Sequence, residues 1–168
     1  MSQLSFTPFH WLDCNVFVEA KNGPFSFAVA PGFWTWLVRA AKEDRVRSPV
    51  AVYNELLEGK DQLANWARSQ RSSGLFVTPD REVQKRYGEI AAFVQSRYQP
   101  PFSAAFLDGA DPWVIAHALD DGGTVVTHET LVSSNSMRVK IPNVCAHFGV
   151  GCIRAYEAFE KLGLKLSS

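Results

Sequence analysis

The stretch DPWVIAHALDDGGTVVT, residues 111–127, decides the fold class because a helix pattern in it leads directly into a strand pattern. Asp111 and Pro112 are typical of a helix start, with a capping residue followed by proline at the first helical position. Apolar residues then recur with helical spacing until Gly122 and Gly123 end the pattern. Residues 124–127 are a β-branched run, which favours a strand. A helix that feeds a strand in this way is typical of a βαβ unit.

The same alternation extends in both directions from this stretch. Short apolar runs predict further strands at residues 9–12, 46–48, 75–77 and 152–153. Helical spacing predicts helices over residues 15–21, 31–41, 49–59, 63–72, 80–100, 144–148 and 156–162, with a loop over residues 99–110. Strands separated by helices predict an α/β fold, a three-layer α/β/α sandwich with a central, mostly parallel sheet.

Length and composition indicate one globular domain. The chain has 168 residues, 46% hydrophobic and 20% charged, so it can bury a core and is not of the disordered class. We therefore treat residues 1–168 as a single domain. Seventeen Lys and Arg balance seventeen Asp and Glu, which argues against a surface coated in positive charge and leaves room for a local basic rim.

Cysteine usage and the N-terminus predict a soluble, cytoplasmic protein. Cys14, Cys145 and Cys152 are odd in number and lack the spacing of a disulfide framework. Residues 1–8 lack a basic and then apolar leader. The most apolar stretch, residues 25–38, is interrupted by proline and glycine and is too short to span a bilayer, so no membrane association is expected.

Four acidic residues follow or adjoin the predicted strands: Asp13, Glu55, Asp111 and Glu129. In open parallel sheets, ligands gather beyond the carboxyl ends of the strands, so we expect these carboxylates to converge. Converging carboxylates repel one another and need a cation, for which Mg²⁺ or Mn²⁺ is the natural partner of oxygen ligands. Each acid taken alone also has a simpler interpretation, and only their joint placement carries the hypothesis.

Those simpler interpretations are structural. Asp13 or Asn15 could cap the following helix, and Asp111 could cap its own. Glu55 could be a solvated charge on a helix face, and Glu129 an ordinary polar turn residue.

Several motifs carry a resemblance to a known family. They are residues 12–17 (Leu-Asp-Cys-Asn-Val-Phe), 53–56 (Tyr-Asn-Glu-Leu), 111–118 (Asp-Pro-Trp-Val-Ile-Ala-His-Ala) and 124–129 (Thr-Val-Val-Thr-His-Glu). In order and spacing they resemble the Asp-x-Asn/Ser opening, the helix-borne glutamate, the Asp-x-x-Ile-Ala-x-x-Ala signature and the Thr-x-Asp strand end of PIN domains, the nuclease fold of VapC-like toxins. Residues 140–145 and 151–153 resemble a branch of uncharacterised PIN-like bacterial proteins.

The resemblance implies a metal-dependent endoribonuclease, commonly the toxin of a toxin–antitoxin pair. By motif, Asp13, Glu55 and Asp111 would be core acids that hold Mg²⁺ or Mn²⁺, and Glu129 would be the fourth. Glu129 departs from the family's aspartate and is one methylene longer, so it could act through water. Asn15 and Thr127 would be supporting polar groups. Hydrolysis by metal-activated water would leave a 5′-phosphate and a 3′-hydroxyl.

Partners follow from the same resemblance. RNA is the expected substrate, with Arg138 and Lys140 as the expected phosphate contacts after Glu129. An antitoxin protein and a second copy of the chain are further expected partners. The remaining cations are expected to be solvated surface charges: Arg39, Lys42, Arg45, Arg47, Arg68, Arg71, Lys85 and Arg86.

Two other functions stay open at this point. A non-catalytic PIN-like module would bind a partner protein through its aromatic residues, with Glu129 as a sign of lost chemistry. A phosphatase would use Asp13 as nucleophile and the Asp120-Asp121 pair as metal acids, although Asn15 occupies the place where such enzymes usually carry a second aspartate.

Overall fold

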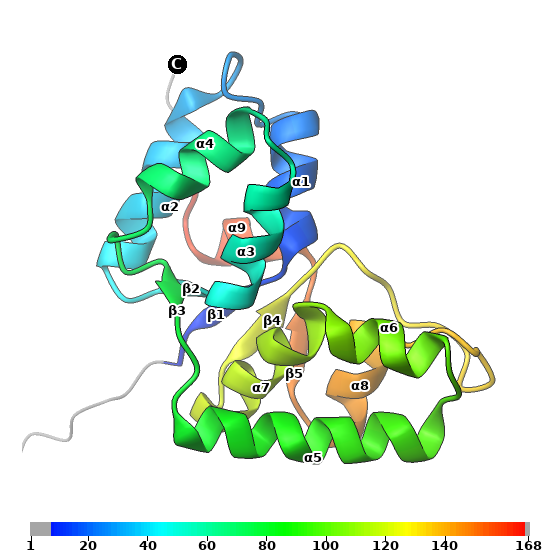
Figure 1. Cartoon of the computed structure of the whole chain (residues 1–168). Coiled ribbons are helices and arrows are strands. Elements are labelled where there is room, and N and C mark those ends of the chain that lie inside the picture. Colours follow the sequence, from blue (N-terminus) through cyan, green and yellow to red (C-terminus); the bar gives the residue numbers. More distant parts are fainter. Residues whose placement is uncertain (1–7, 167–168) are drawn as a thin grey trace, which may run out of the picture.

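The structure, a computed structural model, describes residues 8–166 and has an α/β fold (Figure 1). Its strands form one sheet in the order β3-β2-β1-β4-β5, and every neighbouring pair is parallel. The strands are β1 (His10–Leu12), β2 (Val46–Pro49), β3 (Phe76–Val77), β4 (Thr124–Val126) and β5 (Gly151–Ile153). The predicted α/β/α sandwich with a parallel central sheet is confirmed.

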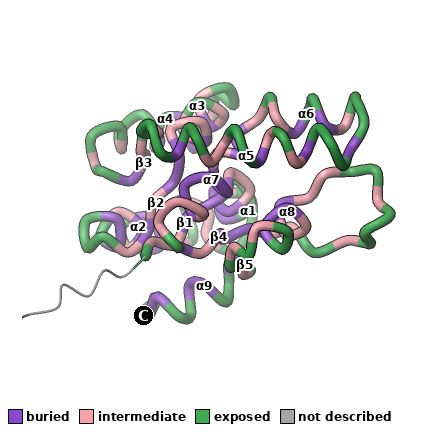
Figure 2. Tube along the Cα trace, turned by 90° about the horizontal axis from the view of Figure 1, so that it is seen from below, coloured by how far each residue is buried: buried purple, intermediate pink, exposed green. Residues whose placement is uncertain are grey.

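Helices make every connection between the strands. They are α1 (Cys14–Asn22), α2 (Pro31–Lys42), α3 (Val50–Glu58), α4 (Gln62–Ser69), α5 (Arg81–Arg97), α6 (Phe102–Asp108), α7 (Asp111–Asp121), α8 (Ile141–Phe148) and α9 (Ala155–Lys161). Figure 2 shows α5 and α7 on one side of the strands and α9 on the other. Helix α2 packs with α9 through the rings of Phe33 and Phe159, whose centroids lie 5.2 Å apart. Among residues 8–166, no helix has the length and apolar composition needed to cross a bilayer.

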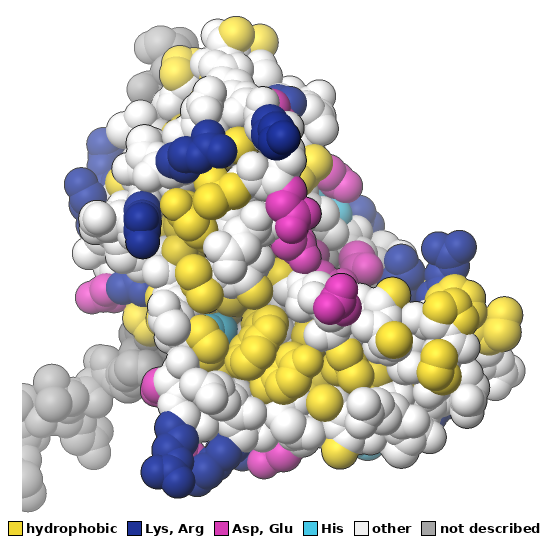
Figure 3. Space-filling view, viewed as in Figure 1, with side chains coloured by type: hydrophobic (Ala, Val, Ile, Leu, Met, Phe, Trp, Pro, Cys, Tyr) yellow, Lys and Arg dark blue, Asp and Glu magenta, His cyan; other side chains and the backbone are white. Residues whose placement is uncertain are grey.

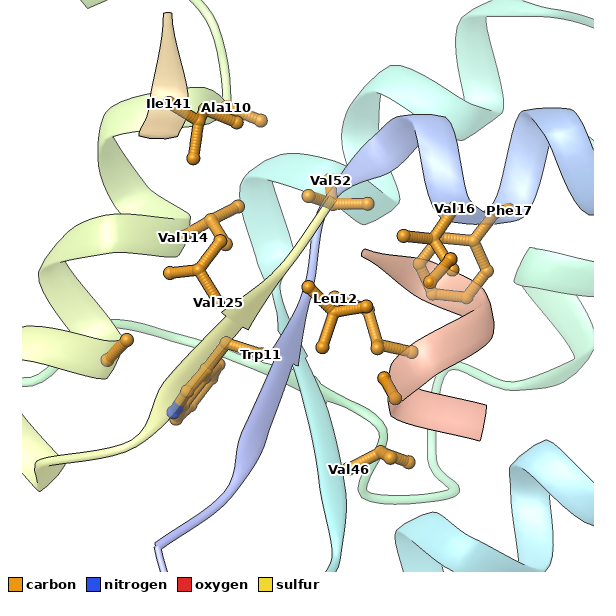
Figure 4. Packing of buried hydrophobic residues seen from close by; sticks show 14 of the residues in the cluster. Trp11, Leu12, Val16, Phe17, Val46, Val52, Ala110, Val114, Val125 and Ile141 are labelled. Atoms are coloured by element: carbon orange, nitrogen blue, oxygen red, sulfur yellow. The ribbon is translucent and has the colours of Figure 1, made fainter. Parts of the chain in front are cut away.

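Alternation along β1 builds the core on both faces of the sheet. Trp11 points to the side of Val125 and of Val114 on α7, while the next residue, Leu12, points to the side of Phe17 on α1 (Figure 4). These side chains are all nearly or completely buried. The side-chain period of two residues in a strand therefore divides the apolar run of β1 between two helical layers.

Two local predictions were wrong. Helix α6 lies inside the expected loop of residues 99–110, since the chain turns into helix directly after Pro101 and buries Phe106. Asp111 is not the N-cap of α7 but its first helical residue. The N-cap is Ala110, and no side chain makes a capping hydrogen bond there. The Asp111 carboxylate is therefore not used on the backbone of its own helix start.

The order of the strands creates a switch point beside β1. The chain passes outward from β1 to β2 and β3, and then returns through α7 to β4 on the other side of β1. Ligand sites of open parallel sheets lie beyond the carboxyl ends of strands at such a point. Asp13 directly follows β1 and Thr127 directly follows β4, so the fold brings both residues to this edge.

Candidate functional site

Asp13 lies at the centre of the candidate site. It is only 3% exposed and is the N-cap of α1, where its Oδ1 accepts a hydrogen bond of 2.7 Å from the backbone N–H of Cys14. Its Oδ2 accepts a hydrogen bond of 2.9 Å from the Thr127 hydroxyl. The capping interpretation of Asp13 is thus correct, and the second oxygen is held towards the end of β4.

Thr127 and Asn15 join the loop after β4 to α1. The Thr127 hydroxyl accepts hydrogen bonds from Asn15 Nδ2 (3.3 Å) and from the backbone N–H of Glu129 (3.1 Å). Asn15 Oδ1 accepts a hydrogen bond of 3.1 Å from the backbone N–H of His128. Asn15 lies inside α1 and does not cap it. Both residues therefore lie within hydrogen-bond distance of one another, and Thr127 also contacts Asp13.

Glu55 reaches the site from α3. Its Oε1 accepts a hydrogen bond of 2.9 Å from the backbone N–H of Ala110, immediately before Asp111. The side chain is half-buried, so it is not the fully solvated helix-face charge of the simpler interpretation. This bond ties α3 to the beginning of α7 and holds the Glu55 carboxylate near that of Asp111.

Glu129 is engaged by α8 and by a lysine. Its Oε2 accepts a hydrogen bond of 3.0 Å from the backbone N–H of Ile141, the first residue of α8. Its Oε1 lies 3.6 Å from Lys140 Nζ. The longer side chain at this position therefore fixes the start of α8 and is itself partly neutralised.

The four carboxylates interact electrostatically. Burial, followed by repulsion from Glu129 and Glu55, raises the pKa of Asp111 to about 7. Burial and repulsion from Asp111 raise the pKa of Asp13 well above its ordinary value, and Glu129 adds to the effect. A carboxylate resists ionisation in this way when it is desolvated beside like charge. The structure thus brings the four predicted acids into one neighbourhood at the switch point.

A cavity of about 560 Å³ opens beside this neighbourhood. Glu55, Cys14 and Gly109 line it, together with the exposed acids Glu58 and Asp108. It lies on the side of the site formed by α1, α3 and α6. Asp108 is exposed and is the last residue of α6.

Cys14 was missed as a site residue by the sequence analysis. Burial, together with the negative charges of Glu55 and Asp13, raises the pKa of its thiol, which also hydrogen-bonds to Glu55. The thiol is therefore neutral and next to two of the acids. Its place directly after Asp13 was the available signal, but a thiol in an apolar run is ordinarily a packing residue.

The donor set fits a hard divalent cation. All four acids offer oxygen. Lys140 offsets only a small part of the repulsion at Asp111, and a bound cation would relieve the repulsion at both Asp13 and Asp111. Within residues 8–166, no three His, Cys, Asp or Glu side chains are already closed into a metal-binding group.

Thr127 offers a direct test of how Asp13 is held. Thr127→Val keeps the shape of the buried side chain but removes the donor to Asp13 Oδ2, and a buried acceptor left without its partner costs about 1–3 kcal/mol. We expect the free energy of unfolding in urea to fall by that amount. Thr127→Ser, which keeps the hydroxyl, should restore most of the lost stability. Equal losses in the two variants would contradict a positioning role for the hydroxyl.

Comparison with known proteins places the chain in a family. The model of the family described as Domain of unknown function (DUF4411) matches residues 10–166. None of the curated proteins matches the chain.

Proposed function

The chain belongs to the family of the domain of unknown function DUF4411, and from the geometry of its candidate site we propose that it is a metal-dependent endoribonuclease of PIN type. It would hydrolyse RNA phosphodiesters with water activated by Mg²⁺ or Mn²⁺. The proposal includes the role that the resemblance implies, the toxin of a toxin–antitoxin pair with an antitoxin protein as its partner.

The observation that carries the proposal is a pair of carboxyl groups at the switch point, the buried one of Asp13 and the half-buried one of Asp111. Asp13 and Asp111 are 98 positions apart in the sequence. The pKa values of both carboxyl groups are raised by burial and by neighbouring acids. Burying like charges costs stability, and a fold retains such an arrangement at functional sites where a bound cation compensates for it. Strain of this kind supports a metal-dependent activity.

Each acid has its own task in the proposed reaction. A bound divalent cation supplies activation of water and neutralises charge on the scissile phosphate. Asp13 and Asp111 would hold the cation, with Glu55 and Glu129 in support, since the pKa values of the first two are the ones raised by burial and neighbouring acids. Thr127 and Asn15 keep the Asp13 carboxylate oriented.

Arg138 fits the task of contacting RNA phosphate better than Lys140. Its side chain is exposed, and among residues 8–166 it has no hydrogen-bond or ion-pair partner. Lys140 lies 3.6 Å from Glu129 and helps to balance the acidic site. We therefore assign phosphate contact to Arg138, with Lys140 chiefly neutralising Glu129.

The phosphatase alternative does not fit the geometry. Asp120 and Asp121 lie at the end of α7, whereas Asp111 begins it, and a helix of eleven residues separates its ends by about 15 Å. Asp121 accepts a hydrogen bond of 2.9 Å from Trp11 Nε1, and Asp120 lies 3.6 Å from Arg86. Both acids therefore have other partners, at the end of α7 opposite to Asp111.

RNA cleavage with and without metal tests the proposal. The purified protein should cut single-stranded RNA in Mn²⁺, leave 5′-phosphate and 3′-hydroxyl ends, and lose activity in EDTA. Restoring Mn²⁺ should restore cleavage. Cleavage that continues in EDTA, or that leaves a 2′,3′-cyclic phosphate, would contradict a metal-dependent hydrolysis.

A further inference from the structure

A groove of about 490 Å³ lies between α2 and α4. Its lining combines cations with indole rings and comprises Trp34, Val38, Arg39, Lys42, Trp66 and Gln70, with Thr35 at its side. These residues include no carboxylate. In a chain whose formal net charge is zero, the groove is therefore a locally positive surface.

The two cations of the groove are not used within the fold. Arg39 and Lys42 are three residues apart on α2, so their side chains lie on one face of the helix. Both are exposed, and among residues 8–166 neither side chain has a hydrogen-bond or ion-pair partner. Arg45 and Arg47, which follow on the same stretch of chain, lie beside Glu43 and Asp44 instead. Of these four cations, the two that line the groove are therefore the two that remain available to bind an anion.

Trp66 supplies a held aromatic surface. It is half-buried on α4, and its ring meets that of Trp34 edge-on, with centroids 4.7 Å apart at 65°. Trp34 is itself fixed, since its Nε1 donates a hydrogen bond of 2.8 Å to the Phe25 carbonyl. The Trp66 ring is therefore kept in place from behind while part of it remains open to the groove.

The groove continues on one side into a second cavity. A neighbouring cavity of about 440 Å³ shares Thr35 and Arg39 with it and adds Trp36 and Lys165. Figure 3 shows dark blue side chains around a yellow area on the lobe of α2 and α4, and magenta side chains on the same face towards α6. Helix α4 packs directly on α3, which carries Glu55. A chain lying in the groove could extend to the acidic site over the same face.

We infer that the groove between α2 and α4 binds a single-stranded segment of RNA, an inference that rests on the proposed function and names how its substrate is held. Proteins bind single strands by pairing cations with backbone phosphates and by stacking bases on aromatic rings. An amphipathic peptide helix instead requires a row of apolar anchors at i, i+3 or i+4, and i+7. The groove offers one open indole between cations, which favours a base flanked by phosphates.

Binding measured in EDTA tests this inference separately from cleavage. A fluorescent oligoribonucleotide is titrated with the wild type and with Arg39→Gln/Lys42→Gln, and anisotropy is followed at several salt concentrations. We expect about tenfold weaker binding, and a salt slope smaller by about 1.4, because each cation on a single strand contributes about 0.7. The control variant Arg81→Gln/Lys85→Gln removes the same charge from exposed positions on α5. It should change neither the affinity for RNA nor the salt slope. Unchanged binding in the first variant, or an equal loss in both, would overturn the inference.

The aromatic part has its own readout. Trp66→Leu should weaken RNA binding about fivefold or more and reduce the quenching of tryptophan fluorescence by RNA, whereas Trp66→Phe, which keeps a ring, should retain most of the affinity. Thermal unfolding of both variants checks that the α2–α4 packing persists. If Trp66→Leu does not fold, the Arg39 and Lys42 variant and Trp66→Phe decide the matter.

The remaining outcomes separate the two proposals. Loss of binding in Arg39→Gln/Lys42→Gln without any cleavage by the wild type in Mn²⁺ would leave the groove as an RNA site and contradict the nuclease. Cleavage with unchanged binding in that variant would support the nuclease and overturn the groove. Binding of poly-glutamate that depends on Arg39 and Lys42, with RNA binding unaffected, would assign the groove to an acidic protein instead.

Discussion

Asp13→Asn is expected to lower the rate of Mn²⁺-dependent RNA cleavage by at least about a hundredfold, and Asp111→Asn to do the same. Both substitutions remove a charge that would hold the cation, and a metal ion contributes several kcal/mol of charge stabilisation in the transition state, with about 1.4 kcal/mol for each factor of ten. Cleavage is measured as the initial rate on a fluorescent RNA in saturating Mn²⁺.

The structure explains why Asp13→Asn should still fold. Asparagine caps helices as well as aspartate does, so it can accept the Cys14 N–H, and its amide oxygen or nitrogen can meet the Thr127 hydroxyl. Asp80→Asn is the matched control, because Asp80 is also an N-cap, on α5, where its Oδ1 accepts the Val83 N–H at 2.9 Å. It should keep full activity. Full activity in Asp13→Asn would remove Asp13 from the catalytic role.

The metal-free protein is expected to lose stability as its acidic site ionises. Burial and repulsion raise the pKa of Asp111 from 3.8 to about 7 in the folded state. Between these two values the folded state binds more protons than the unfolded state, so this group's contribution to stability is present at low pH and is lost as pH rises towards 7. A shift of one unit corresponds to about 1.4 kcal/mol, and we expect a loss of about 2–4 kcal/mol by pH 8.

Asp111→Asn separates this effect from other titrations. Burial lowers the pKa of His117 to about 4, which stabilises the fold in the opposite direction as pH rises, but that contribution is shared by both proteins and cancels in their difference. In EDTA at pH 8 the variant should melt about 5 °C above the wild type, and the gap should close by pH 4. Adding Mn²⁺ at pH 8 should raise the melting temperature of the wild type and leave that of the variant unchanged. A variant less stable than the wild type at pH 8 in EDTA would contradict the repulsion.

Much of the fold could be predicted from local sequence patterns, and the predictions that were wrong have physical explanations. The β-branched run of residues 124–126 and the helix before it predicted β4 and α7, because both sequences agree with their tertiary surroundings. Helix α6 was missed since its seven residues are too few to display a helical period and follow two prolines that mark an ending. The N-cap of α7 was misplaced by one residue because Asp-Pro is the common signal for a cap.

The sequence predicts the residues of the candidate site that directly follow a strand, because the ends of the strands could be predicted. Asp13 and Thr127 are placed by the rule for parallel sheets, since each follows a strand at the switch point. Glu55 depends on α3 packing against the start of α7, a contact that no local pattern contains. The engagement of Glu129 by Ile141 and Lys140, the neutral Cys14 thiol and the α2–α4 groove likewise depend on tertiary contacts.

The contact between Asp13 and Thr127 joins residues 114 positions apart, and this has a consequence for biosynthesis. A polypeptide emerging from the ribosome carries Asp13 early, but β4 and Thr127 leave the exit tunnel only when more than two thirds of the chain has been made. Until then β1 lacks its neighbour on one side, and the acids have no common edge at which to meet. The acidic site is therefore incomplete for as long as the growing chain is still close to its own messenger RNA on the ribosome.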